Sequence, residues 1–433
     1  MEEGKKMYKL AQKIFPIFRC LMGSGVRETL EIIKEYLIEN ANVEMQIIGV
    51  PSGTKVFDWK IPEEWIIKKA YIENQNGERI VDIEKNNLYV VGYSAPIDKW
   101  VTKKELNEYV YVQEEQPDVI PYVTSYYKKQ SGFCMSKNDL QALHEGKYHL
   151  VIDSKFIDGE LTYGEVFIPG LTDEEVFFST YICHPSMANN ECSGPALMTE
   201  IISYIQKMNN RRYSYRFIFI PETIGSLTYM SQRNNLERMR EKVIAGFNLT
   251  CVGDDNAFSL VHSRYADTYA DRILENILKY KKNFTEYNFL SRGSDERQYC
   301  APGIDLPIVT FCRSKFHEYA EYHTSADDMK FISSEGLQGS YDALVDAINL
   351  IEKNEVYCTT VLGEPQMGKR GLYPTISKKG NNISTKNMMN FLAYADGRND
   401  LIQISDIIGV PVNCLIDIAD KLLEEGLIQK WKY

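Results

Sequence analysis

The sequence lacks the long apolar runs and basic patches that mark membrane and nucleic-acid-binding proteins. No apolar stretch approaches the roughly 18 residues that a membrane span needs, so we expect no membrane segment. The formal net charge is −11, and an acidic chain is not attracted to phosphate backbones or anionic lipid. We therefore expect neither a membrane nor nucleic acid as a partner.

The sequence also lacks paired cysteines and a leader-like N-terminus. Its nine cysteines are odd in number and include no Cys-x-x-Cys pair. Cys183, Cys251 and Cys312 stand in apolar, strand-like contexts, which is typical of reduced and buried thiols. Residues 1–6 do not show the basic-then-apolar order of a signal peptide. These features predict a cytoplasmic protein.

Several catalytic signatures are missing as well. There is no P-loop and no Rossmann glycine fingerprint. A Ser-His-Asp triad that used Ser193 would need a G-x-S-x-G elbow, and residues 191–195 do not supply one. Histidine is scarce, so any histidine-based metal site must draw on six positions, which are 144, 149, 184, 262, 317 and 323.

Alternating strands and helices are predicted from about residue 171 to 355. The strands are expected at 175–182, 215–220, 243–248 and 306–311, and the helices at 195–208, 226–241, 267–281 and 334–353. This alternation predicts a largely parallel sheet covered by helices, which is an α/β fold. Two amphipathic helices, over 3–20 and 25–41, are expected to pack on the same sheet.

Short β-type runs fill the chain between those N-terminal helices and the α/β region. They extend from Val43 to about Gly170, with a hairpin turn signal at Asn76-Gly77. The pattern predicts a mainly β module inserted into the α/β unit.

The C-terminal residues show a different pattern. After a Gly/Pro/Lys/Asn-rich connection over 355–385, short helices are expected at 387–395, 401–409 and 412–425. The last two, followed by a strand-like end, resemble a helix-turn-helix and the start of a wing. The helix that would enter a DNA groove carries four acids and one lysine, which favours packing or homo-oligomerisation over DNA binding.

Reactive side chains gather in the loops that follow the predicted parallel strands. His184 and Glu191 follow the first strand, and further polar loops are 221–226, 250–255 and 316–328. Because the carboxyl ends of parallel strands meet at one edge of a sheet, these loops should converge. Two histidines and several carboxylates would suit a Zn²⁺ site with an open position for water, and a free carboxylate would serve as general base.

Simpler explanations exist for each residue taken alone. His184 suits a hydrogen-bonded loop histidine, and Glu222 could stabilise the first turn of the following helix. Asp254-Asp255 is typical of a solvated turn. His317 and His323 lie six residues apart and need not face one site.

Seven segments resemble an aminopeptidase-like family of unknown function that is related to the M28 zinc peptidases and often occurs with polysaccharide-biosynthesis proteins. The segments are 56–59, 115–127, 183–195, 221–226, 293–299, 321–325 and 363–373. The resemblance implies a zinc-aminopeptidase-like α/β/α sandwich with an inserted mainly β domain and a C-terminal winged-helix domain. The corresponding domains are a discontinuous catalytic domain, an insert and a winged helix, at 1–45 with 165–358, 46–164 and 359–433.

The resemblance also implies how the site differs from true M28 enzymes, which hold two zinc ions. His184 and His323 match the first and last histidine ligands of that family. Asn190 stands where the bridging aspartate is expected, and Thr223 stands where the second residue of a glutamate pair is expected. The remaining acid of that family falls near Thr250 here, with Asp254 and Asp255 just beyond.

The implied site therefore holds one Zn²⁺ rather than two. His184, Glu191 and His323 would be its ligands, and Glu222 would be the general base. A substrate-binding role is assigned to Asn190, Asp295 and Glu318, of which the two acids would bind a substrate amine.

The implied function is a zinc-dependent hydrolase of the aminopeptidase type. It would cleave an amide bond in a small peptide or an amide-containing sugar precursor. The alternative is a non-catalytic binding or scaffold protein on a degenerate peptidase fold, associated with polysaccharide biosynthesis. A third hypothesis is DNA-binding regulation through the C-terminal helices.

Overall fold

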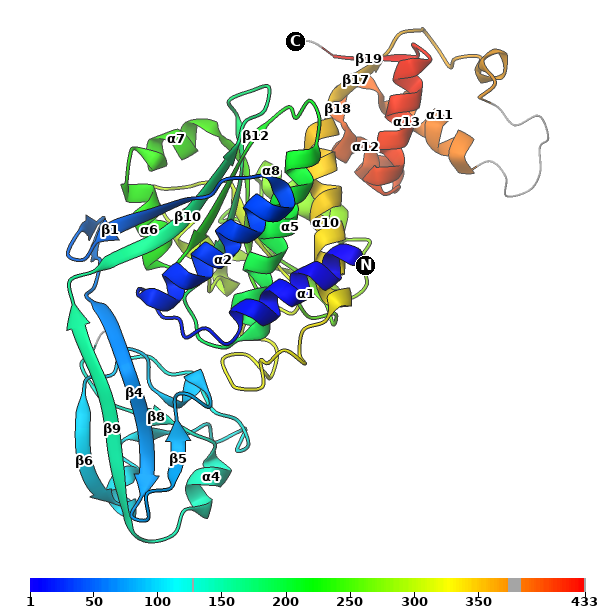
Figure 1. Ribbon diagram of the computed structural model, residues 1–433. Coiled ribbons are helices and arrows are strands. Elements are labelled where there is room, and N and C mark those ends of the chain that lie inside the picture. Colours follow the sequence, from blue (N-terminus) through cyan, green and yellow to red (C-terminus); the bar gives the residue numbers. More distant parts are fainter. Residues whose placement is uncertain (127, 373–382, 432–433) are drawn as a thin grey trace.

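The computed structural model describes residues 1–126, 128–372 and 383–431 (Figure 1). Residues 127 and 373, which end two of the segments singled out above, lie outside the described part, as does much of the connection over 355–385. A large mixed sheet forms the centre of the molecule. Its strands, in spatial order, are β1 (Gln46–Pro51), β10 (Glu160–Ile168), β12 (Ser214–Ile220), β11 (Glu175–Tyr181), β13 (Val243–Leu249), β16 (Ile308–Cys312), β14 (Phe258–Val261) and β15 (Phe284–Tyr287).

The middle of this sheet is parallel, and both flanks join it through antiparallel pairs. Strands β12, β11, β13 and β16 run parallel to one another. Strands β10 and β1 extend one flank antiparallel, and β14 pairs antiparallel with β16 on the other. The carboxyl ends of the four central strands therefore lie at one edge, which is where ligands bind in sheets of this kind.

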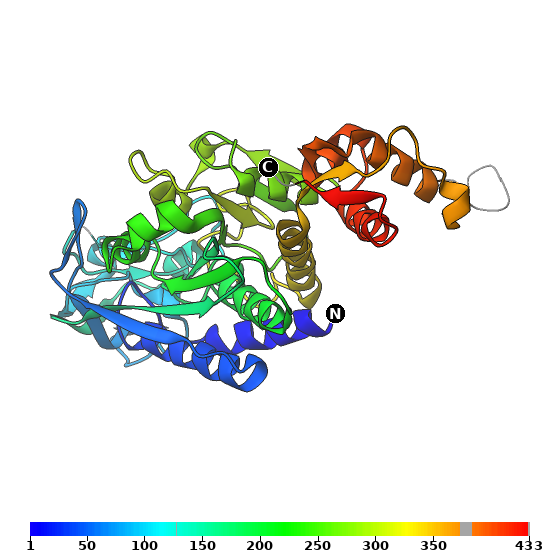
Figure 2. The same cartoon turned by 90° about the horizontal axis from the view of Figure 1, so that it is seen from above.

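Helices cover both faces of the sheet, as Figures 1 and 2 show. One face carries α1 (Glu2–Ile14), α2 (Ser24–Ala41), α5 (Ser193–Lys207), α8 (Tyr269–Leu278) and α10 (Ser334–Lys353). The other face carries α6 (Ile224–Ser231), α7 (Asn235–Lys242) and α9 (Glu296–Tyr299). This arrangement confirms the predicted α/β/α sandwich.

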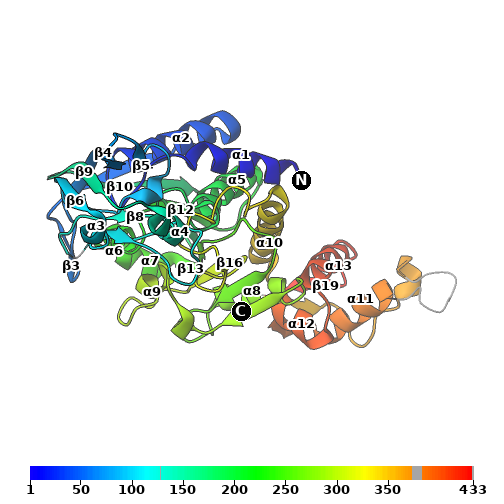
Figure 3. The ribbon, with the colours of Figure 1, turned by 90° about the horizontal axis from the view of Figure 1, so that it is seen from below.

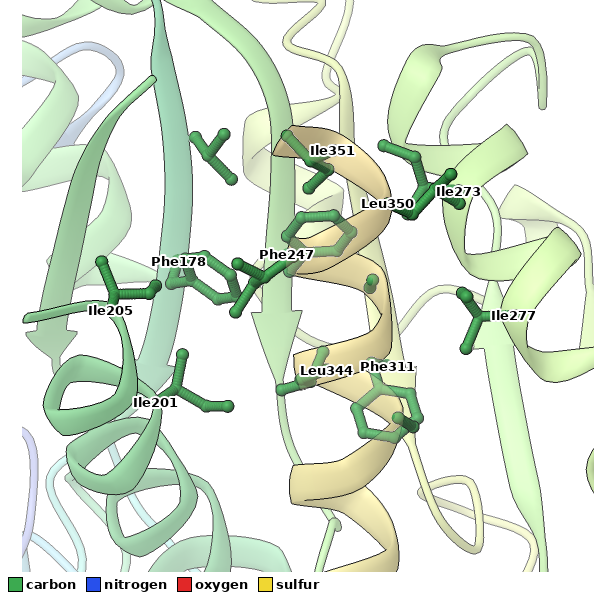
Figure 4. Packing of buried hydrophobic residues seen from close by; sticks show 14 of the residues in the cluster. Phe178, Ile201, Ile205, Phe247, Ile273, Ile277, Phe311, Leu344, Leu350 and Ile351 are labelled. Carbon is green, nitrogen blue, oxygen red and sulfur yellow. The ribbon is translucent and has the colours of Figure 1, made fainter. Parts of the chain in front are cut away.

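Alternating side chains of the central strands fill two separate cores. In β11, Phe178 faces the core beneath α5 and α10, whereas its neighbour Phe177 faces the core beneath α6. Successive strand residues point to opposite faces, so a continuous apolar run supplies both cores. Figure 4 shows Phe178, Phe247 and Phe311 from adjacent strands packed against isoleucine and leucine side chains of the covering helices.

Two of the predicted helices were too long. The helix predicted over 3–20 ends at Ile14, because Pro16 has no N–H with which to continue the hydrogen-bond ladder. The helix predicted over 226–241 is interrupted between α6 and α7, where Arg233 and Asn234 take left-handed backbone angles. Strands β14 and β15 were not predicted, since each has only four residues.

The mainly β module leaves the large sheet between β1 and β10. Its main sheet contains β5 (Arg79–Asp82), β4 (Glu64–Asn74), β9 (Lys147–Ile157) and β6 (Ile97–Thr102), all paired antiparallel. Smaller elements are β2 (Lys55–Val56), β3 (Trp59–Lys60), β7 (Val110–Tyr111), β8 (Phe133–Cys134), α3 (Lys103–Leu106) and α4 (Lys137–Ala142). Figure 3 views the molecule from below, with the module overlying one end of the sandwich.

The C-terminal unit has the winged-helix arrangement. Strand β17 (Val356–Thr359) pairs antiparallel with β18 (Asp396–Asp400) and β19 (Ile428–Lys430). The helices are α11 (Ile383–Tyr394), α12 (Leu401–Ile408) and α13 (Val412–Glu424). Arg272 of α8 contacts Asp400 at 2.7 Å, and Lys353 of α10 contacts Asp420 at 3.2 Å, so this unit rests on the sandwich.

Among the described residues, no single helix is long and apolar enough to cross a membrane. Helices α12 and α13 reach that length and hydropathy only as a pair, with a bend of 117° between them.

Candidate functional site

The loop after β11 enters α5 through one turn of π-helix, η2 (Ala188–Cys192). The sequence predicted a loop between strand and helix here, and π turns inside helices are often found at functional sites. Asp327 holds it, because its carboxylate accepts hydrogen bonds from the main-chain N–H groups of Asn189 at 2.6 Å and Asn190 at 3.0 Å. Burial raises the pKa of Asp327 to about 7. The Asn189 side chain in turn accepts from the N–H of Gly253 at 2.7 Å, which ties three post-strand loops together.

His184 and Glu191 form a buried pair at the centre of this loop. Nδ1 of His184 lies 2.8 Å from Oε2 of Glu191, and Oε1 of Glu191 lies 3.8 Å from the guanidinium of Arg19. Arg19 is 1% exposed and also donates to the main-chain oxygen of His184 at 3.2 Å. A buried carboxylate is thus held between an imidazole and a guanidinium, which offsets the cost of removing its charge from water.

His323 approaches His184 from the loop after β16. The two imidazole rings are 5.6 Å apart between centroids. Tyr122, from the inserted module, packs on both rings at 5.2 and 5.1 Å and donates its main-chain N–H to the oxygen of His323 at 2.9 Å. Burial lowers the pKa of His323 well below its ordinary value, so the imidazole is neutral at pH 7, the form that binds metals.

Glu222 reaches the opposite nitrogen of His184. Oε2 of Glu222 lies 3.7 Å from Nε2 of His184, and the Glu222 side chain is 20% exposed. Burial raises the pKa of Glu222 above its ordinary value. A carboxylate with a raised pKa beside an imidazole is suited to move protons near neutral pH.

A strained turn fixes the direction of Glu222. Thr223 has φ +64° and ψ −72°, and the N–H of Ile224 donates to the oxygen of Glu222 at 2.7 Å. These values define the positive-φ γ-turn, which is rare and strained for a β-branched residue. Asp295 stabilises the turn by accepting from the N–H of Thr223 at 2.7 Å and from the Ser226 hydroxyl at 2.8 Å.

A small cavity of about 130 Å³ opens between these groups. Its polar wall consists of Cys183, His184, Glu222, Thr223 and Arg297. Its apolar wall is made of Leu21, Trp59, Tyr126 and Ile224, so the inserted module contributes two aromatic side chains.

Asn190 lies in a network of neutral side chains. Its amide donates to the Tyr181 hydroxyl at 2.7 Å, and that hydroxyl shares a 2.5 Å hydrogen bond with Thr250. Its amide oxygen has no hydrogen-bond partner within the described part of the chain. A second metal ion prefers carboxylate oxygens, and this network offers amide and hydroxyl groups in their place.

The predicted site residues are only partly brought together. His184 and Glu222 line the cavity, whereas Glu191 and His323 lie against His184 without lining it. Asn190 lies in the same π-helical turn as Glu191. Asp295 lies behind Thr223 and supports the turn. Glu318 has a side chain that is 55% exposed and lies 3.9 Å from Lys315, and the cavity is not lined by it.

Sequence reasoning missed Arg19, Tyr122, Tyr126, Arg297 and Asp327. The segment 115–127 carried the family resemblance without an assigned role, and it supplies Tyr122 and Tyr126. Arg19 and Asp327 lie outside the segments that carry the resemblance, and no local motif marks them.

The donor set includes residue types that can hold a metal ion. Ligand atoms of Cys183, His184 and Glu191 lie within 4.8 Å of one another. Within the described residues, the buried atoms Oε1 of Glu191 and Nε2 of His323 have no hydrogen-bond partner. Buried polar atoms are normally hydrogen-bonded; Oε1 of Glu191 faces the Arg19 guanidinium at 3.8 Å, whereas Nε2 of His323 is left available to a cation. Burial raises the pKa of the Cys183 thiol to about 11, which keeps it protonated without a metal.

Comparison with known sequences places the chain in a family. A family model described as a domain of unknown function, DUF4910, matches residues 8–354, and a winged helix-turn-helix model matches 355–430. The chain belongs to the DUF4910 family. A Clostridium acetobutylicum relative of this DUF4910 protein is 39% identical over 432 residues, covering 99% of this chain and 97% of its own. Its name assigns it provisionally to polysaccharide biosynthesis and gives it an aminopeptidase-like domain.

Solved structures confirm the fold of the DUF4910 protein. A crystal structure of a provisionally assigned peptidase from C. acetobutylicum has 38% identity and a TM-score of 0.91, covering 99% of this chain and 97% of that chain. A zinc aminopeptidase from Bacillus subtilis has 13% identity and a TM-score of 0.57, covering 80% and 94%. An M28 peptidase precursor from Shewanella amazonensis has 10% identity and a TM-score of 0.57, covering 81% and 95%. The predicted resemblance to an M28-related, aminopeptidase-like family is thereby confirmed.

Proposed function

We propose that this protein is a zinc-dependent hydrolase of the aminopeptidase type that cleaves a small peptide or an amide-containing sugar precursor. His184, Glu191 and His323 would hold one Zn²⁺, and Glu222 would be the general base. The observation that carries the proposal is the 3.7 Å approach of Glu222 to Nε2 of His184 at the wall of a cavity.

Each residue has a role that follows from its surroundings. A bound Zn²⁺ supplies a Lewis acid for the amide carbonyl and lowers the pKa of water towards 7. Glu222 accepts the proton of the attacking water and returns it to the nitrogen of the leaving amine. The aromatic wall of Trp59 and Tyr126 limits the water that enters and positions the substrate against Glu222.

Metal content and activity test the proposal together. We expect elemental analysis of the purified protein to give about one zinc per chain, and Glu222→Gln to retain the metal while losing amidase activity by about 10²–10⁴-fold. Glu241→Gln, which changes an exposed carboxylate on α7, is the matched control and should leave the rate unchanged. Stoichiometric metal without Glu222-dependent turnover on a broad amide panel would contradict the proposal.

The second candidate is a non-catalytic binding or scaffold protein that works in polysaccharide biosynthesis. The neutral network around Asn190 favours it, because that position lacks the carboxylate of a two-metal enzyme. The name of the C. acetobutylicum relative agrees with this setting. If His184→Ala and His323→Ala both leave metal content and thermal stability unchanged, the scaffold function gains and the hydrolase is excluded.

A further inference from the structure

Arg297 lines the cavity beside Glu222, and no carboxylate of the described residues lies within ion-pair distance of its guanidinium, although its charge acts on Glu222 and Asp295 from farther away. Two other partly buried arginines have a carboxylate partner, namely Arg216 with Glu165 at 2.6 Å and Arg27 with Glu64 at 2.8 Å. The Nε of Arg297 is buried and has no hydrogen-bond partner in the described part of the chain. A buried N–H donor without a partner is costly unless a ligand satisfies it.

The guanidinium is held in place. It donates to the hydroxyl of Thr223, the residue at the centre of the strained γ-turn. Strain of this kind persists where the surroundings enforce it, as they often do at ligand sites. Asp295 enforces the turn from behind through its hydrogen bonds to Thr223 and Ser226.

Thr223 and Arg297 also account for the altered glutamate pair. A hydroxyl follows Glu222 where a second carboxylate would bind another cation, and this hydroxyl accepts from a guanidinium instead. Arg297 thus places a fixed positive charge next to the residue that stands in place of the second glutamate. The Arg297 guanidinium cannot exchange as a metal ion can, and its planar set of N–H donors matches the two oxygens of a carboxylate.

We propose that Arg297 binds a carboxylate of the substrate within the cavity, next to the amide that Glu222 acts on. The preferred substrates are therefore small amides with a free carboxylate close to the scissile bond. The small volume and the aromatic wall of Trp59 and Tyr126 restrict the remainder of the ligand to a compact apolar group. The substrate preference rests on the proposed hydrolase activity. The binding of a carboxylate by Arg297 rests only on the cavity.

Matched substrate pairs test the reaction. The pairs differ only by a carboxylate in place of a carboxamide, for example L-leucyl-L-alanine against L-leucyl-L-alaninamide, and further pairs carry the carboxylate on the acyl side. We expect wild type to prefer the carboxylate member in at least one series by about tenfold or more in kcat/KM, mainly through KM. Arg297→Gln should abolish that preference, and Arg297→Lys should restore part of it. Arg292→Gln, an exposed arginine in the same loop, should keep it.

An equal loss on both members of every pair would overturn the inference, since Arg297 would then only tune Glu222. An absent preference in wild type would overturn it too. If no amide is cleaved, the proposed hydrolase activity is rejected on its own. A binding measurement then tests whether Arg297 forms a carboxylate site. Calorimetry with 4-acetamidobenzoate and 4-acetamidobenzamide should show carboxylate-selective binding that Arg297→Gln removes and Glu222→Gln retains. Binding without selectivity, or no binding of either probe, rejects the site.

Discussion

Nδ1 of His184 lies 2.8 Å from Oε2 of Glu191, and this contact orients the ring so that Nε2 faces Glu222. One imidazole thus separates two carboxylates with different surroundings. Glu191 has a fully buried side chain beside Arg19, whereas Glu222 borders the cavity. In the proposed hydrolase, Glu222 would therefore transfer protons, and Glu191 would hold either the metal or the His184 ring.

Glu191→Gln should distinguish these two roles of Glu191. The variant keeps an acceptor for the His184 ring but removes the charge that a zinc ligand needs, so we expect metal content to fall from about one per chain to near zero. Elemental analysis after dialysis measures this. A loss of only about 10–100-fold in affinity, with full occupancy in excess zinc, would instead assign Glu191 to orienting His184. Cys183→Ala is the matched control, and metal retention there excludes a thiolate ligand.

Arg19→Met should destabilise the fold by about 3 kcal/mol or more. The substitution removes the guanidinium that faces the buried Glu191 carboxylate and the donor to the main-chain oxygen of His184. Chemical denaturation measures the free energy of unfolding, and Lys13→Met on the exposed side of α1 is the control. The double variant Arg19→Met with Glu191→Gln should recover part of the loss, because the unpaired charge is gone. Strictly additive losses would show that the two residues do not interact.

The sequence was sufficient to predict the parallel centre of the sheet and the convergence of His184, Glu222 and His323. Parallel strands place the loops at their carboxyl ends on one edge, so residues distant in the chain could be brought together by topology alone. The ends of helices were less predictable, as the break between α6 and α7 at Arg233 and Asn234 shows. The three-domain division remains a prediction. Strand β1 and the start of β10 fall within the predicted insert 46–164, and they pair with each other in the large sheet.

Arg19, Tyr122 and Arg297 could not be predicted as site residues. Each is brought to the site by packing between segments that are far apart in the chain, and no spacing rule links Arg19 to Glu191 or Tyr122 to His323. The γ-turn at Thr223 was also hidden, because threonine is unfavourable at positive φ and its sequence predicts no such turn. Strained functional positions are where local sequence rules are expected to fail.

Asp295→Asn should change how stability depends on pH. Burial, with a contribution from Glu222, raises the pKa of Asp295 from 3.8 to about 7. The folded state therefore binds this proton more tightly than the unfolded state. The contribution of Asp295 to the free energy of unfolding falls as pH rises from about 4 to about 7, by at most about 1.4 kcal/mol per pH unit.

The asparagine removes this dependence and keeps an oxygen that can accept from Thr223 and Ser226. We expect the variant to gain stability relative to wild type between pH 5 and pH 7.5, as measured by denaturation at both values. Asp255→Asn, at an exposed position, should show no such gain. A difference between Asp295→Asn and wild type that is constant with pH would show that Asp295 is ionised throughout this range.

Asn190→Asp restores the carboxylate that a two-metal enzyme has at this position, and we expect it not to restore the second metal. The Thr223 hydroxyl is engaged by Arg297, and the Thr250 hydroxyl is engaged by Tyr181. The added carboxylate would therefore have no acidic side chain at Thr223 or Thr250 with which to share a metal ion. The Arg297 guanidinium would also repel a second cation.

The substitution also removes the amide donor to Tyr181 and buries a charge close to Glu191, which should cost about 2 kcal/mol or more of stability. Elemental analysis should therefore still give about one zinc per chain, together with a lower midpoint of unfolding. Asn256→Asp, at an exposed position, is the control for the added charge. Two metal ions per chain in Asn190→Asp would contradict this expectation, because they would show that the neutral network, rather than Arg297, is what excludes the second ion.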